Sequence, residues 1–162
     1  RSLGGQGYGV GSSWTRGQGW AVYVFMISYL HTKEQKYLDT AKKVADYCLE
    51  NIPDSGIIPV DFRQPAEPAW EDSCGACVMA GGLLELAGCL PEGERERYED
   101  AAVKILRAIG ESRADFGRGC DAIVQNLSSA YHVQVHHENM SYADYFFMEA
   151  VYKVKGTGQF MW

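Results

Sequence analysis

The 162-residue sequence has no long apolar run and no basic region. It contains no stretch of about 18 uncharged apolar residues, which argues against a membrane-spanning helix. The 15 Lys+Arg residues are outnumbered by 21 Asp+Glu residues, and the formal net charge is −6. Because no cluster of Lys and Arg offsets this balance, neither nucleic acid nor an anionic membrane surface is expected as a partner. With 46% hydrophobic and 22% charged residues, the composition is that of one globular domain.

Cysteine is scarce, and its count of 5 is odd. Thiols scattered through helical segments are typical of a reduced intracellular protein rather than of a disulfide framework. Cys74 and Cys77 form a lone C-x-x-C without a second ligand pair at suitable spacing, so small apolar groups in a helix contact are favoured over a zinc or redox site. His132, His136 and His137 lie in a stretch without helical periodicity, which favours a histidine-bearing loop over a metal site. We expect no metal and no cofactor.

The prolines and glycines mark the loops. Four of the five prolines fall within residues 52–72, which excludes a regular helix there. Residues 1–13 are glycine-rich and aperiodic, and Ser12 or Ser13 stands where a helix N-cap is expected. A further loop is expected at about 114–139.

Apolar spacing between these loops predicts five helices. Their expected ranges are about 15–31, 34–51, 73–89, 94–112 and 140–155. The third is small and apolar nearly all round, so it has to be buried on most sides. The second and fourth have one apolar face and one polar face, which is typical of outer helices.

An inner-type helix, an outer-type helix and a long loop therefore occur in that order twice, and a third inner-type helix follows. This repetition predicts stacked helical hairpins in an all-α fold, and in a ring of hairpins the loops before the inner helices converge at one end around a cavity. Two and a half hairpins do not close a ring. We therefore expect an uncovered side on the helix at 73–89, and chain missing from the ring.

One short segment carries a specific resemblance. Residues 13–20 read SWTRGQGW, which resembles the S-x-W-x-R-G-Q-x-W signature of glycoside hydrolase family 88, the unsaturated glucuronyl hydrolases. Gln18 favours these enzymes over the related unsaturated rhamnogalacturonyl hydrolases, which tend to have asparagine there.

Weaker similarities follow in family order. They are D-F-x-x-P at 61–65, EDSCGA at 71–76, GLLEL at 82–86 and ADYFFMEA at 143–150. The resemblance implies an α/α toroid of the (α/α)6 barrel type. Residues 1–162 would be about half of this single domain, its C-terminal part, with the N-terminal half absent.

The resemblance also implies an activity. The family releases 4,5-unsaturated glucuronic acid from oligosaccharides made by polysaccharide lyases, by protonating the vinyl ether and adding water across it. Both key aspartates of the family lie in its N-terminal half, so no catalytic residue is assigned here, and this chain alone is expected to be inactive. The expected partners are an unsaturated uronic-acid oligosaccharide and either the missing half or a second copy of the chain. We expect a bacterial cytoplasmic enzyme.

Four residues are expected to bind substrate by this resemblance. Arg16 and Trp20 lie one turn apart at a helix start, where a guanidinium can pair with a uronate and an indole can cover a sugar ring. Gln6 matches a family glutamine, and Tyr142 precedes the last inner helix. The alternatives are that Arg16 pairs with a nearby aspartate and that Trp20 and Tyr142 only pack. The alternative function, which follows from the absence of the two catalytic aspartates, is a non-catalytic helical module that binds carbohydrate or protein.

Overall fold

The computed structural model describes residues 5–117 and 119–157, which form five helices. They are α1 (Thr15–Thr32), α2 (Gln35–Asn51), α3 (Ser73–Gly88), α4 (Glu92–Ser112) and α5 (Ser141–Val154). Every predicted helix is present, with each end within two residues of its expected position. Outside the helices, this part of the chain forms isolated β-bridges rather than strands.

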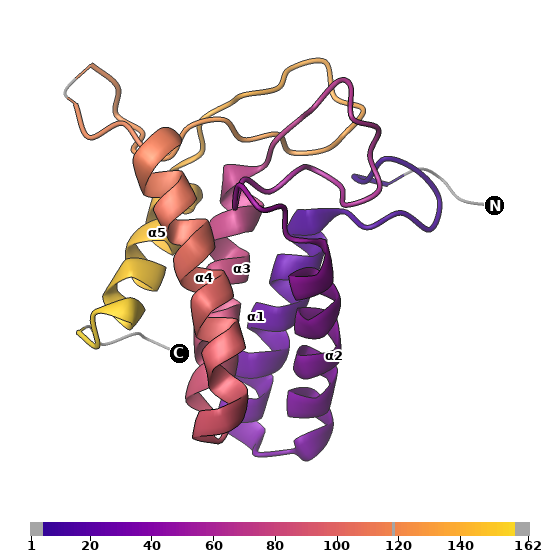
Figure 1. Ribbon diagram of the computed structural model, residues 1–162. Helices are drawn as coiled ribbons and strands as arrows, with labels where there is room; N and C mark the ends of the chain where they lie inside the picture. The colour runs from indigo at the N-terminus through magenta and orange to yellow at the C-terminus, as the bar shows by residue number, and fades with distance from the viewer. Residues whose placement is uncertain (1–4, 118, 158–162) are drawn as a thin grey trace.

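The helices form two layers (Figure 1). α3 packs between α1 and α5, while α2 packs on α1 and α4 packs on α3. The inner layer is therefore α1–α3–α5 and the outer layer is α2–α4. The loops that precede the three inner helices lie together at one end of the bundle, at the top of Figure 1. This arrangement confirms the predicted stack of hairpins, and we call this end the mouth.

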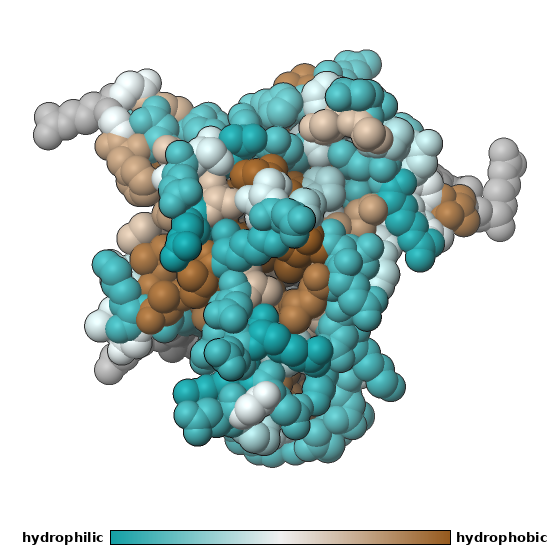
Figure 2. Space-filling view, in the orientation of Figure 1, coloured by the Kyte–Doolittle hydropathy of each residue, from teal (hydrophilic) through white to brown (hydrophobic). Residues whose placement is uncertain are grey.

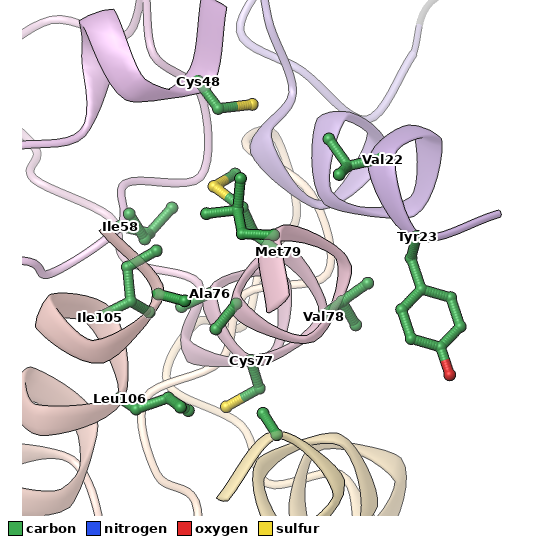
Figure 3. Packing of buried hydrophobic residues seen from close by; sticks show 14 of the residues in the cluster. Val22, Tyr23, Cys48, Ile58, Ala76, Cys77, Val78, Met79, Ile105 and Leu106 are labelled. Carbon is green, nitrogen blue, oxygen red and sulfur yellow. The ribbon is translucent and has the colours of Figure 1, made fainter. Parts of the chain in front are cut away.

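α3 is the centre of the core (Figure 3). Nearly all of its residues are buried, including Cys77, Met79 and Leu83 at 0% exposure. The expectation of an uncovered side on this helix was wrong. α1, α4 and α5 surround α3, and the ring of Tyr23 reaches from α1 to the glycines of α3 on the side away from α4.

Glycines bring α1 and α3 into backbone contact. A Cβ added to Gly19 would lie 3.0 Å from the Gly75 carbonyl oxygen and 3.1 Å from the Met79 nitrogen. A Cβ on Gly82 would lie 2.9 Å from the Tyr23 nitrogen. These positions need glycine because no side chain fits between the two helices.

The start of α1 differs from the predicted cap. Its N-cap residue is Trp14, and no side chain caps the helix. Ser13 Oγ instead shares a hydrogen bond of 2.6 Å with the Tyr47 hydroxyl, and Ser12 Oγ donates to Asp61 at 2.6 Å. Tertiary hydrogen bonds thus engage the hydroxyls that local sequence assigns to the cap.

Apolar side chains also gather outside the core. Figure 2 shows a hydrophobic patch over α4 and α5, in a groove lined by Val103, Leu106, Val151 and Val154. Within residues 5–117 and 119–157, none of the helices combines the length and apolar character that a bilayer crossing requires.

Candidate functional site

One arginine joins the starts of all three inner helices. Arg16, in the first turn of α1, donates from Nε to Asp72 Oδ2 at 2.7 Å and from Nη2 to Asp72 Oδ1 at 2.6 Å. Asp72 is the N-cap residue of α3. Arg16 Nη1 donates to the hydroxyl of Tyr142, in the first turn of α5, at 2.5 Å. The sequence thus places three motif segments at one end of the bundle, and this guanidinium connects them.

Arg16 is buried, and most of its donors are used. Only 4% of the residue is exposed, and Nη2 also donates to the Ser128 carbonyl at 3.1 Å. Burial opposes the charged form, but the hydrogen bonds and charge of Asp72 raise the pKa of Arg16 above its ordinary value. Burial also raises the pKa of Asp72, against the opposing effects of Arg16 and of the backbone N–H groups of Cys74 and Gly75.

This pairing is the one expected if Arg16 binds a nearby aspartate rather than a substrate carboxylate. The two-nitrogen edge that would grip a uronate carboxylate already holds Asp72. Arg16 therefore does not offer that edge to a ligand while Asp72 stays in place. Arg16 also donates to Tyr142, and 39% of the surface of Tyr142 is exposed.

Trp20 lies one helical turn beyond Arg16 and is half-buried. Its ring packs edge-on against Phe146, with centroids 5.0 Å apart, and against Tyr23 at 6.3 Å. Phe146 follows Tyr142 by one turn of α5. The pairs Arg16–Tyr142 and Trp20–Phe146 are thus successive contacts between α1 and α5, and Trp20 serves as packing on one edge.

Gln6 reaches the same end of the bundle through the loops. Its carbonyl accepts from the Tyr131 N–H at 2.8 Å, and its Nε2 donates to the Ser129 carbonyl at 3.2 Å. Ser129 is next to Ser128, whose carbonyl Arg16 contacts. The side chain of Gln6 is exposed. The structure therefore brings Gln6 to the mouth through this loop.

Asp61, in the D-F-x-x-P segment, holds neighbouring loop residues in place. Asp61 accepts from the N–H groups of Tyr8, Ser13 and Arg63 at 3.0, 3.0 and 2.8 Å. Burial opposes its ionisation, yet these bonds and the one from Ser12 lower the pKa of Asp61.

Asp144 acts in the same way on another loop. Its Oδ1 accepts from the N–H groups of Ile123 and Val124 at 3.1 and 2.7 Å. Asp61 and Asp144 thus hold two of the loops at the mouth, while Asp72 binds Arg16 of α1.

An aromatic cleft that sequence reasoning did not assemble lies between two of the loops. The rings of Trp70 and His136 stack with centroids 3.9 Å apart and planes 4° from parallel. Tyr131, His132 and His137 also line this cavity of about 530 Å³. Trp70 and His136 are 66 residues apart in sequence, so no local pattern links them.

The cleft histidines and the C-x-x-C pair do not form a ligand cluster. His132 Nε2 lies 2.7 Å from the Tyr8 carbonyl, as expected of loop histidines that contact backbone. Burial raises the pKa of the Cys74 thiol to about 12, and it also raises the pKa of the Cys77 thiol well above its ordinary value. Over residues 5–117 and 119–157, no three His, Cys, Asp or Glu side chains are grouped as metal ligands.

Known proteins similar to this chain are glycosidases of one kind. No protein-family model matches it. The unsaturated glucuronyl hydrolase of Bacillus sp. strain GL1 is 34% identical over 93% of this chain and 41% of its own length. The unsaturated chondroitin disaccharide hydrolase of Streptococcus pneumoniae is 27% identical over 97% of this chain and 41% of its own length.

Solved structures agree with the sequence comparison. The crystal structure of the Bacillus sp. GL1 unsaturated glucuronyl hydrolase matches 96% of this chain and 42% of that chain, with a TM-score of 0.85 and 32% identity. A heparin-specific unsaturated glucuronyl hydrolase matches with a TM-score of 0.84 and 26% identity, covering 94% of this chain. The fold is thus the α/α toroid of these enzymes, and the chain spans about two fifths of the length of its curated relatives. Along almost all of its own residues, this chain is homologous to the unsaturated glucuronyl hydrolases of glycoside hydrolase family 88.

Proposed function

We propose that this chain is the C-terminal part of a single α/α-barrel hydrolase. The enzyme would release 4,5-unsaturated glucuronic acid from lyase-generated oligosaccharides by hydrating the vinyl ether. In this proposal, residues 1–162 supply a substrate-binding wall, and an N-terminal half supplies the catalytic aspartates. The observation that carries it is 34% identity to an unsaturated glucuronyl hydrolase over 93% of the chain.

The wall that we propose consists of Tyr142, Trp20 and Gln6, with Arg16 behind Tyr142. Arg16 donates to the Tyr142 oxygen. The thiol of Cys74 also acts on that hydroxyl, and sulfur is a weak hydrogen-bond partner. The Tyr142 hydroxyl can therefore exchange the thiol contact for a substrate oxygen while Arg16 holds it in place.

The test uses the protein that joins this chain to its N-terminal half. An unsaturated chondroitin disaccharide is the substrate, and loss of the vinyl-ether absorbance reports hydration. The absorbance is expected to fall with time. A folded full-length protein that leaves the absorbance unchanged would refute the proposed activity.

Tyr142→Phe tests the wall within that assay. Loss of one hydrogen bond to an anionic substrate is expected to raise KM by about tenfold. Tyr152→Phe is the matched control, because Tyr152 is an equally exposed tyrosine of α5 at the opposite end of the bundle. Equal KM values for the two variants would show that Tyr142 is not part of the proposed wall.

The binding-module alternative predicts a different result for the isolated chain. Asp61 and Asp144 are engaged in bonds that hold loops, and Asp72 is engaged by Arg16 of α1. If the chain is only a module, it binds the disaccharide, and joining the N-terminal half adds no turnover. Calorimetry on the isolated chain beside the absorbance assay separates the two functions.

A further inference from the structure

A buried polar cluster lies about 10 Å below the mouth, two helical turns along α1 from Arg16. The Tyr23 hydroxyl donates to Glu149 of α5, with its oxygen 2.9 and 3.1 Å from the two carboxylate oxygens. Lys153 also pairs with Glu149, and its Nζ lies 2.8 Å from Glu85 of α3. Tyr23 is 5% exposed and Glu149 is 3% exposed. The cluster therefore links all three inner helices inside the protein.

Packed rings connect this cluster to the mouth. The Tyr23 ring meets Phe146 with centroids 5.4 Å apart, and Phe146 meets Trp20 at 5.0 Å. α3 places a glycine beneath Tyr23, since a Cβ on Gly81 would lie 3.6 Å from that ring. The position of Trp20 thus depends on side chains of α1 and α5 that meet across α3.

We infer that Tyr23 and Glu149 are positioning residues that set the place of Trp20 in the substrate-binding wall. This inference rests on the proposed function for its consequence, because the wall is part of that proposal. Neither residue is assigned a contact with substrate. The hydrogen bond fixes the Tyr23 ring, the ring fixes Phe146, and Phe146 supports the indole from the side of α5.

The outer layer offers a matched control. Tyr98 of α4 is also buried, and its hydroxyl donates to a carboxylate oxygen of Asp46 in α2 at 2.5 Å. Tyr23→Phe and Tyr98→Phe therefore remove the same group from the same kind of bond. Only the first lies on the route to Trp20.

The first measurement needs no substrate. The protein is labelled with 5-fluorotryptophan, and Trp20→Phe assigns the Trp20 fluorine resonance. Tyr23→Phe and Glu149→Gln are each expected to shift or broaden this resonance, while Tyr98→Phe leaves it in place. An unmoved Trp20 resonance in both inner-layer variants overturns the inference, whatever the enzyme acts on.

The second measurement uses the full-length enzyme. Tyr23→Phe is expected to raise KM by about threefold with kcat nearly unchanged, and Tyr98→Phe to change neither. A proportional loss of kcat in both variants would indicate general damage and overturn the positioning role. A wild-type enzyme without turnover would contradict the proposed function, but the fluorine result would still stand.

Discussion

The ion pair between Arg16 and Asp72 lies at the mouth and affects the stability of the protein. Both side chains are almost fully buried, at 4% and 0% exposure. Breaking such a pair leaves a charge in the interior without compensation. The pair therefore concerns stability first, and it bears on the proposed substrate-binding wall only through Tyr142.

Asp72→Asn is expected to lower the free energy of unfolding by about 3–5 kcal/mol, measured by urea denaturation. The control is Glu34→Gln, which removes an exposed partner of Lys36 and should cost less than about 1 kcal/mol. Equal losses in the two variants would show that the buried guanidinium finds another partner.

The hydrogen bonds that Asp61 accepts hold the glycine-rich N-terminal loop, and they are expected to be sensitive to acid. The pKa of Asp61 is lowered in the folded state, so the unfolded chain takes up its proton first as the pH falls. The stabilisation is therefore complete above about pH 5 and declines as the pH falls further. Asp61→Asn should cost about 2 kcal/mol at pH 6, and this difference should shrink between pH 5 and pH 3. Asp54→Asn, at a fully exposed position, should show no such trend.

Burial also governs the thiols. The pKa of Cys48 and that of Cys74 are both raised to about 12, so neither forms thiolate near neutral pH. Iodoacetamide at pH 8 should modify the partly exposed Cys120 before either of them, as peptide mass spectrometry would reveal. Early labelling of Cys74 in the folded protein would contradict the buried environment.

Sequence alone predicted the type of these residues but not their partners. Arg16 at a helix start left both a substrate and an aspartate open as its partner, because the aspartate lies 56 residues away in sequence. Ser13 had the chemistry of a cap but is engaged by Tyr47. Long-range contacts of this kind depend on how hairpins pack, which local spacing does not encode.

At the scale of elements, α3 shows why glycine is used inside a helix. Gly82→Ala would place a Cβ 2.9 Å from the Tyr23 nitrogen. The strain should exceed the roughly 1 kcal/mol that alanine adds to helix stability, so the variant should unfold at a lower temperature than the wild type.

Gly110→Ala in α4 provides the opposite case. Apart from its chain neighbours and the backbone of its own helix, no atom lies within 4 Å of its added Cβ, so this variant should gain about 0.5–1 kcal/mol. Calorimetric melting of both variants checks the pair. A rise in melting temperature for Gly82→Ala would mean that α1 and α3 can separate without loss.

The helices themselves were predictable because their apolar periodicity is strong. α2 and α4 each have one apolar face against the inner layer, and α3 is apolar all round. The coverage of α3 was not predictable. α3 is covered because the Tyr23 ring lies over Gly81 and packs against Phe146. The number of hairpins in the sequence does not predict these contacts.

At the scale of the whole molecule, the groove between α4 and α5 exposes apolar surface. Val154 alone is 48% exposed. The chain expressed by itself should therefore bind a hydrophobic dye or self-associate, as fluorescence and light scattering would show. Val154→Glu should reduce both signals, whereas Val10→Glu, in an exposed loop, should not. A monomer without dye binding would contradict this expectation.

The hairpin order predicted an arc of a ring, and homologous full-length toroids support that architecture. What sequence order could not supply is the distance between neighbouring helices, which is set by residue size at the contacts. Gly19, Gly75 and Gly82 decide it here.

Because α1 and α5 both pack on α3, the width of that helix sets the spacing between them. Replacing a glycine of α3 by a larger residue is expected to move Trp20 away from Phe146 while Trp20, Tyr142 and Gln6 keep their identity. In the proposed enzyme, the size of saccharide that the wall accepts would therefore depend on buried glycines, and a change in accepted size would need no substitution in the wall itself.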